Sequence, residues 1–310
     1  MIIVRNLSRY FHTTATTMAV EKTALASLRK KTGYTFANCK KALEIHNNDL
    51  TKAEGWLREQ AQALGWSKAT KLEGRQTTQG LIGVTFDNNN GVIVEVNCET
   101  DFVARNKEFQ EMVQEATEVC MHYARNNPKS TKNIMKIGLD GNQLKSLKTE
   151  DGTTLADKLA LMIGNVGENA TLKRAVCLKV NNGIYLEGYA HPSGNTKGNV
   201  HLGRLGGLVA LKSLDNSHSE ENLQEIGKGL CQHIVGMAPK QIGKITDEPS
   251  ENKEEELSLI HQEYLLDDSL KIKDVLEENK VEVIDFQRFE CGEIHNTVGD
   301  QPLELVETCQ

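Results

Sequence analysis

Aromatic residues and long apolar runs are both scarce in this sequence of 310 residues. Phe, Trp and Tyr together make up 5% of the chain, so a buried core must be built mainly from Leu, Val, Ile and Ala. No apolar run approaches the length that a membrane-spanning helix needs, so we do not expect a membrane protein. The length fits about two domains, each large enough to bury a core.

Motifs of catalysis and of cofactor or metal binding are also missing. The sequence contains no G-x-S-x-G and no H-E-x-x-H, and Gly203–Val209 is a poor phosphate loop that we interpret as a turn before a strand. The seven cysteines are dispersed without a C-x-x-C pair, which is typical of reduced, mostly buried thiols in a reducing compartment. Cys231 and His233 stand two residues apart and would not face each other on a helix. We therefore expect a binding protein without cofactor or metal, and not an enzyme.

Charge is distributed unevenly along the chain. Residues 22–75 contain eleven Lys and Arg against five Asp and Glu, whereas residues 245–310 contain five against nineteen. The net charge of −7 and the sequence pI near 5.8 argue against DNA or RNA as the main partner. The basic segment can bind RNA only as a local patch, and solvated helix faces are the simpler interpretation.

The first twenty residues have the composition of an import signal. Arg5 and Arg9 occur among several Ser and Thr residues, and the first acidic residue is Glu21. The continuous apolar segment of a secretory signal is absent. We interpret residues 1–20 as a mitochondrial presequence in preference to a disordered tail. The mature protein is then expected to be soluble in the mitochondrial matrix.

Residues 22–65 have the pattern of three short helices with apolar stripes. Basic residues followed by Gly33 suit the end of the first helix, and Asp49 can cap the third, which we expect to end at Gly65. Such a unit is a small bundle, better suited to recognition than to catalysis. The polar and basic residues 66–80 follow as a predicted linker.

The apolar pattern then changes to the alternation of β-strands. Strands at 81–86 and 92–98 flank an Asn-rich turn, which predicts a hairpin, and strands at 172–180 and 184–190 predict a second one. In the strand at 92–98 we expect one buried face and one partly wet face that carries Glu95.

Two such hairpins, each next to helical segments, predict an α+β core of two similarly built halves with antiparallel sheets. We place these halves at residues 81–170 and 171–293, and a tail at 294–310. The other predicted elements are helices ending near 124, at 155–163, 223–237 and 260–265 and up to 279, and strands at 205–211 and 281–289.

Phe102 is open to two interpretations. If a helix begins before it, Phe102 continues the apolar stripe of Phe109 and Val113 and belongs to the core, which periodicity favours. If Asn106 caps the helix instead, Phe102 lies in the preceding turn.

Several segments together resemble the translation elongation factor Ts family. The stretch TDFVARN at 100–106, preceded by VEVNCE, is similar to the family signature, and CKKAL at 39–43 resembles part of its N-terminal helical domain. Further similar segments are WLRE at 56–59, VGEN at 166–169, LKR at 172–174, YAH at 189–191 and FECGE at 289–293. These segments follow the family order from about residue 22 to 293, and the presequence indicates the mitochondrial branch.

The resemblance implies a fold and a function. The N-terminal module at 22–65 would be a three-helix domain of the ubiquitin-associated (UBA) type. The protein would be a guanine nucleotide exchange factor that binds the GTPase domain of mitochondrial elongation factor Tu, with no cofactor. We expect no DNA and no membrane as partner, and RNA is disfavoured. In the family, an Asp-Phe pair wedges between helices of the GTPase domain and disturbs the Mg²⁺ and phosphate environment, so that GDP leaves.

The family's contact residues carry over to seven positions. Asp101 and Phe102 match the wedge, and Val166 and Gly167 match a second contact turn. His201 is an alternative to His191, because the loop before Gly203 is longer than in relatives. The residues expected to contact the partner are Thr100, Asp101, Phe102, Val103, Val166, Gly167 and His191.

Two segments depart from the family pattern. The loop Gly33–Phe36 differs from the small residues and methionine of many relatives. The acidic segment after Ile245 is too short for the helical hairpin of some bacterial members. The main rival interpretation is a UBA-type or RNA-binding adaptor without exchange activity, and an enzyme with a cysteine nucleophile comes third.

Overall fold

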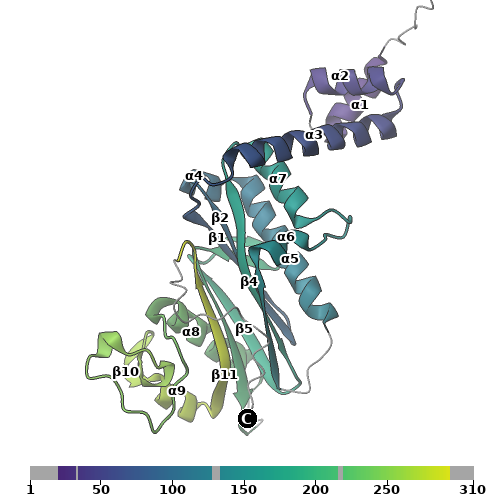
Figure 1. Cartoon of the computed structure of the whole chain (residues 1–310). Coiled ribbons are helices and arrows are strands. Elements are labelled where there is room, and N and C mark those ends of the chain that lie inside the picture. The colour runs from purple at the N-terminus through teal and green to yellow at the C-terminus, as the bar shows by residue number, and fades with distance from the viewer. Residues whose placement is uncertain (1–19, 33, 128–132, 216–218, 294–310) are drawn as a thin grey trace, which may run out of the picture. The chain divides into compact units, whose positions relative to one another are not determined.

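The computed structural model of the protein describes residues 20–32, 34–127, 133–215 and 219–293 (Figure 1). By its contacts the chain divides into two compact units, Met1–Leu64 and Gly65–Gln310. The predicted presequence up to residue 19, Gly33 and the predicted tail 294–310 lie outside the described residues.

The first unit is a bundle of helices, as the sequence predicts. α1 (Lys22–Thr32), α2 (Phe36–Ile45) and the first part of α3 (Leu50–Leu72) enclose a small core. Thr35 caps α2, where its hydroxyl accepts a hydrogen bond from the amide of Asn38 over 3.3 Å. The buried residues are Ala24, Leu28, Cys39, Ala42, Leu43, Ala53 and Leu57.

The predicted end of the third helix at Gly65 is wrong, because α3 runs straight through this residue. The first part of the predicted linker at 66–80 is therefore helical. Gly65 allows close packing within the second unit, since a Cβ there would lie 2.7 Å from the carbonyl oxygen of Ala160 on α7 (Leu155–Val166). This packing outweighs the low helix propensity of glycine, about 1 kcal/mol.

The second unit begins with a six-stranded antiparallel sheet of order β3-β4-β2-β1-β7-β6. Its predicted hairpin is confirmed, because β1 pairs with β2 and the Asp87 carboxylate accepts hydrogen bonds from the amides of Asn89 and Asn90 at 2.9 and 2.7 Å. The strands are β1 (Gln79–Phe86), β2 (Asn90–Cys98), β3 (Ile134–Asp140), β4 (Ala170–Val180), β6 (Thr196–Lys197) and β7 (Val200–Gly203).

A second, three-stranded antiparallel sheet has the order β11-β8-β5. Its strands are β5 (Ile184–His191), β8 (Leu205–Ser213) and β11 (Val281–Glu290). The predicted second hairpin is wrong, because β4 pairs with β2 and β3 whereas β5 pairs with β8. The turn at 181–183 carries the chain from one sheet to the other, so the predicted boundary between residues 170 and 171 assigns β4 to the wrong sheet.

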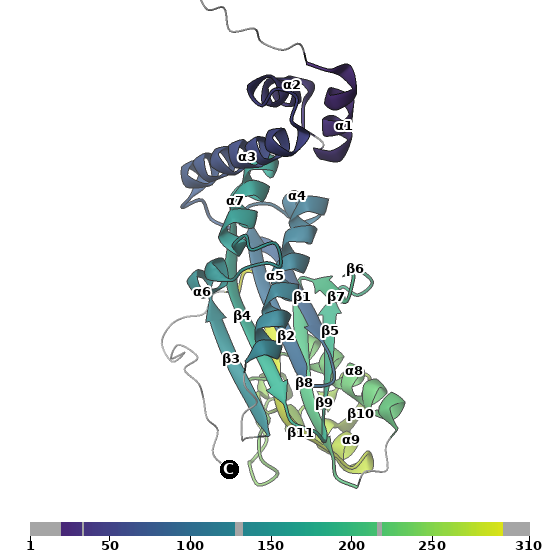
Figure 2. The same cartoon turned by 90° about the vertical axis from the view of Figure 1, so that its right-hand side faces the viewer.

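Helices cover the outer face of each sheet (Figure 1). α5 (Lys107–Asn126), α6 (Gly141–Ser146) and α7 pack on the first sheet, and Figure 2 shows α5 lying across it. α8 (Glu220–Met237) and α9 (Ile272–Glu278) pack on the second sheet, while Ile93 of one sheet and Leu186 of the other belong to the core between them. The resulting layers of helix, sheet, sheet and helix confirm the predicted α+β class.

A long connection, residues 238–271, joins α8 to α9 and includes the position where the sequence predicts a helix at 260–265. It contains the 3₁₀ turns η1 (Lys253–Glu255) and η2 (Leu259–His261), followed by β9 (Glu263–Tyr264), which pairs with β10 (Asp267–Lys271). The predicted helix is thus a single turn. Within the described ranges, no helix is long and apolar enough to cross a membrane.

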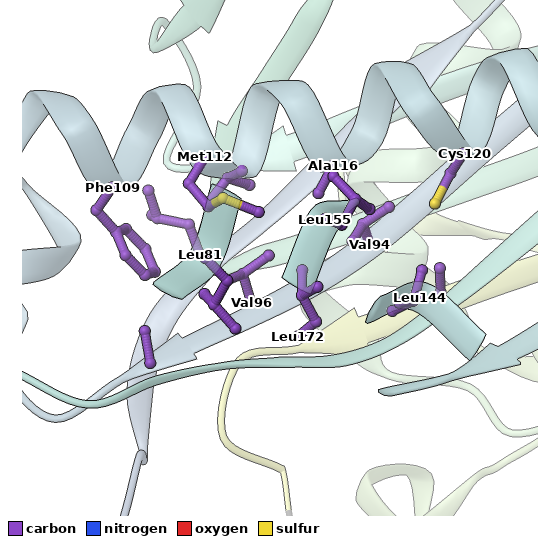
Figure 3. Close-up of a cluster of buried hydrophobic side chains, with 14 of the residues drawn as sticks. Leu81, Val94, Val96, Phe109, Met112, Ala116, Cys120, Leu144, Leu155 and Leu172 are labelled. Atoms are coloured by element: carbon purple, nitrogen blue, oxygen red, sulfur yellow. The ribbon is translucent and has the colours of Figure 1, made fainter. Parts of the chain in front are cut away.

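The main core lies between α5 and the first sheet. Figure 3 shows side chains of α5 pointing at the strands below, at helical spacings of three and four residues. The labelled residues from α5 are Phe109, Met112, Ala116 and Cys120, and those from the strands are Leu81, Val94, Val96 and Leu172. Burial of this stripe fixes how α5, and the chain that leads into it, lie on the sheet.

The face of β2 that carries Glu95 is more deeply buried than the sequence predicts. Glu95 is fully buried, because the second sheet covers the face that a single sheet would expose to water. Its carboxylate accepts hydrogen bonds from Arg174 Nε at 2.7 Å and from the amide of Gly292 at 2.9 Å. These partners compensate the desolvation of the charge and attach the end of β11 to the first sheet.

Candidate interaction site

A one-turn helix at the end of β2 carries the most exposed large apolar side chain of the described chain. This helix, α4, covers Asp101–Ala104. Phe102 is 76% exposed, whereas the next two residues, Val103 and Ala104, are buried in the core beneath α5. The interpretation of Phe102 as a core residue, which periodicity favoured, is therefore wrong.

Asn106 is the physical reason for this exposure. Its backbone is extended, with φ −66° and ψ 139°, and its Oδ1 accepts a hydrogen bond from the amide of Glu108 over 2.8 Å. It therefore starts α5 afresh and rotates α4 out of the stripe that Phe109 begins. The alternative that placed Phe102 in the turn before a capped helix is confirmed.

Asp101 stands beside the exposed ring and is itself half-exposed. Its Oδ2 forms an ion pair with Arg105 Nη2 at 2.6 Å, one helical turn along the chain. One short turn thus carries an exposed aromatic ring and, at the preceding residue, a half-exposed carboxylate. Such a pair can fill an apolar crevice and accept hydrogen bonds from donors at its rim.

The second predicted contact turn lies against the first. Val166 ends α7, and Gly167 follows with φ +81°, where its amide donates to the carbonyl of Ile163 over 2.9 Å. The next residue, Glu168, accepts a hydrogen bond from the Thr100 hydroxyl at 2.9 Å. The structure therefore brings residues 100–103 and 166–167 together at one end of the first sheet.

Three further residues of this arrangement, Glu99, Glu168 and Asn169, were not among the contact residues predicted from the sequence. The Glu99 carboxylate accepts a hydrogen bond from the amide of Asn169 at 2.6 Å, next to the bond between Thr100 and Glu168. The available signal was the VGEN segment, in which Glu168 and Asn169 follow the predicted contact residues directly.

His191 belongs to the other sheet. It ends β5 and is exposed, and its Nδ1 lies 3.2 Å from the hydroxyl of Tyr189. The alternative residue, His201, is partly buried with its ring stacked on Phe86 at 6.2 Å between centroids, and burial lowers its pKa. In the part of the chain that the structure describes, no hydrogen bond or ion pair joins His191 to Asp101 or Phe102.

The cysteines offer no reactive thiol among the described residues. All six that are described are buried, and burial raises the pKa of Cys98 to about 12. Cys231 donates to the carbonyl of Glu187, whereas the ring of His233 contacts Gln262, so the two do not form a catalytic pair. No group of three or more His, Cys, Asp or Glu within the described residues could hold a metal ion.

Comparisons with known proteins agree with the motifs. Residues 8–67 match the family described as "Elongation factor Ts, mitochondrial, N-terminal", and residues 99–251 and 242–293 match "Elongation factor TS". The chain is 57% identical to the Aedes aegypti protein named elongation factor Ts, mitochondrial, over an alignment of 274 residues. This alignment covers 88% of this chain and 89% of the relative. The proteins of that name from Drosophila melanogaster and Rattus norvegicus are 50% and 45% identical, and the alignments cover 94% and 89% of this chain and 94% and 85% of the relatives. The chain therefore belongs to the elongation factor Ts family, in its mitochondrial branch.

Proposed function

We propose that this protein is a guanine nucleotide exchange factor that binds elongation factor Tu in the mitochondrial matrix and promotes release of GDP. The names of the relatives support an elongation factor of mitochondria. The observation that carries the mechanism is the Phe102 ring, which is 76% exposed although the next two residues of the turn, Val103 and Ala104, are buried. An apolar ring held in water at a fixed place is suited to insertion into a partner.

On this proposal, Asp101 and Phe102 act as a wedge on the GTPase domain. GDP is held largely by Mg²⁺ and by backbone amides around its phosphates, so a small displacement of that shell weakens several strong interactions at once. Burial of a phenylalanine side chain contributes about 1.5–3 kcal/mol, which can drive the helices of the partner into another packing. Cores change between discrete packings more readily than they stretch.

No covalent step is needed, so the proposed role is not that of an enzyme that converts a substrate. The protein would bind the nucleotide-free partner more tightly than the GDP-bound one. By thermodynamic reciprocity, bound GDP would then weaken the complex by the same factor. Val166, Gly167 and His191 would add contacts around the wedge.

The test is the release of fluorescent GDP from mitochondrial elongation factor Tu. Wild type should accelerate release, and the double variant Asp101→Ala/Phe102→Ala should lose about tenfold or more of that acceleration while its circular dichroism is unchanged. Leu266→Ala is a matched control, since Leu266 is also an exposed apolar residue, at 56%. No acceleration by wild type would exclude the exchange function, whereas equal acceleration by the double variant would exclude only the wedge.

A further inference from the structure

The wedge helix is too short to hold its own direction. α4 has four residues, and an isolated turn of helix is unstable in water. Its backbone position therefore depends on contacts outside the helix. Burial of Val103 and Ala104 fixes its inner side, but the N-terminal end at Thr100 is only partly buried.

The Thr100 hydroxyl makes two hydrogen bonds of opposite sense. It accepts from the amide of Val103 over 3.3 Å, which caps α4, and it donates to Glu168 Oε2 over 2.9 Å. A hydroxyl has one proton to donate, so both of its roles are used within the protein. The bond to a carboxylate is the stronger type, because the acceptor is charged.

Glu168 in turn follows the second contact turn directly. Gly167 adopts a left-handed backbone that ends α7, and the amide of Asn169 donates to Glu99 over 2.6 Å. Two successive residues before the wedge are thus bonded to two successive residues after the second turn. These cross-links set the spacing between Phe102 and Gly167.

We propose that Thr100 and Glu168 are positioning residues, which act as a clasp that aims the Phe102 ring and holds the two contact turns at one separation. This inference rests on the proposed exchange function. It assigns the Thr100 hydroxyl to the inside of the protein, and it gives Glu168 a role in exchange that involves no contact with nucleotide. A loosened clasp leaves only a fraction of molecules with a correctly aimed ring, and activity falls to that fraction of its wild-type value.

Four variants separate the two bonds of Thr100. Glu168→Ala removes the clasp and leaves the cap, whereas Glu168→Gln keeps a carbonyl acceptor. Thr100→Val removes both bonds at nearly constant shape, and Thr100→Ser keeps both. The matched control is Asn165→Ala, which deletes a side-chain hydrogen bond of 2.9 Å to Glu108 from a residue close to the clasp.

The measurement is the rate of fluorescent GDP release against exchange-factor concentration, using the full chain. Glu168→Ala and Thr100→Val should lower the maximal rate about five- to tenfold, as expected for one charge-assisted hydrogen bond. Glu168→Gln, Thr100→Ser and Asn165→Ala should stay within about twofold of wild type. Unchanged rates in the first two variants, or an equal loss in Asn165→Ala, would overturn the clasp.

A coupling experiment distinguishes positioning from a merely structural role. Once Phe102 is replaced by Ala, there is no ring to aim, so adding Glu168→Ala should cause no further loss of rate. Independent, multiplying losses would overturn the proposal. If wild type itself fails to accelerate release, the exchange function fails; if only Phe102→Ala matters, the clasp alone fails.

Discussion

Phe102 and Phe109 stand seven residues apart, a spacing that places two residues on one face of a helix, yet the first is 76% exposed and the second fully buried. The difference comes from two caps. Thr100 starts the short helix α4 and Asn106 starts α5, so the two rings belong to two separately capped helices. A helix cap that interrupts an apolar stripe can therefore leave an apolar side chain exposed and available for binding, although its spacing alone places it in the core.

The sharpest test of this comparison is to truncate each ring in turn. Phe109→Ala should lower the free energy of unfolding by about 3–5 kcal/mol, because it leaves a cavity between α5 and the first sheet. Phe102→Ala should change it by less than about 0.5 kcal/mol, since little of the ring is buried. Urea unfolding followed by circular dichroism measures both. Similar losses in the two variants would mean that Phe102 packs into the core in solution.

Much of the fold could be predicted from local sequence. The predictions that were wrong share one cause, which is contact between residues distant in the sequence. The first hairpin and the three-helix unit depend on turns, caps and stripes, which act between near neighbours. The second Asn-rich turn carries the same local signal but joins two different sheets, because its flanking strands find other partners. The helical conformation at Gly65 likewise depends on a distant contact with α7, and the burial of Glu95 depends on the second sheet.

The candidate site divides in the same way. Asp101 and Phe102 could be located only through resemblance to a family, because periodicity placed the ring in the core. The cap by Asn106 was foreseen as an alternative, but nothing local gave it more weight than the stripe. The VGEN segment contains Glu168, but its bond to Thr100 could not be predicted, since it joins residues 68 positions apart. The family motif thus points to Asp101 and Phe102, whereas only the tertiary structure shows the hydrogen bond between Thr100 and Glu168.

The cap that separates the two phenylalanines should have a moderate effect on stability. Asn106→Ala removes the acceptor for the amide of Glu108 and should lower the free energy of unfolding by about 1 kcal/mol. Asn106→Asp and Asn106→Ser retain a capping oxygen and should stay within a few tenths of a kcal/mol of wild type. The urea midpoint of each variant provides the measurement. An alanine variant as stable as wild type would show that core burial alone separates α4 from α5.

The ion pair beside Phe102 should have the smallest effect of all. The Arg105 side chain is 75% exposed and that of Asp101 44%, so water screens their attraction, and Arg105→Ala should change the free energy of unfolding by no more than about 0.5 kcal/mol. The same value of about 0.5 kcal/mol limits how much the ion pair can favour or oppose insertion of the wedge into a partner. It corresponds to about a two- to threefold change in the rate of GDP release. Asp101→Ala, in contrast, removes the proposed contact itself and should lose more. GDP release measured with Arg105→Ala, Arg105→Lys and Asp101→Ala distinguishes ion pairing from contact with the partner. A loss beyond about tenfold in Arg105→Ala exceeds what an exposed ion pair can supply. Such a loss would mean that the guanidinium itself contacts the partner.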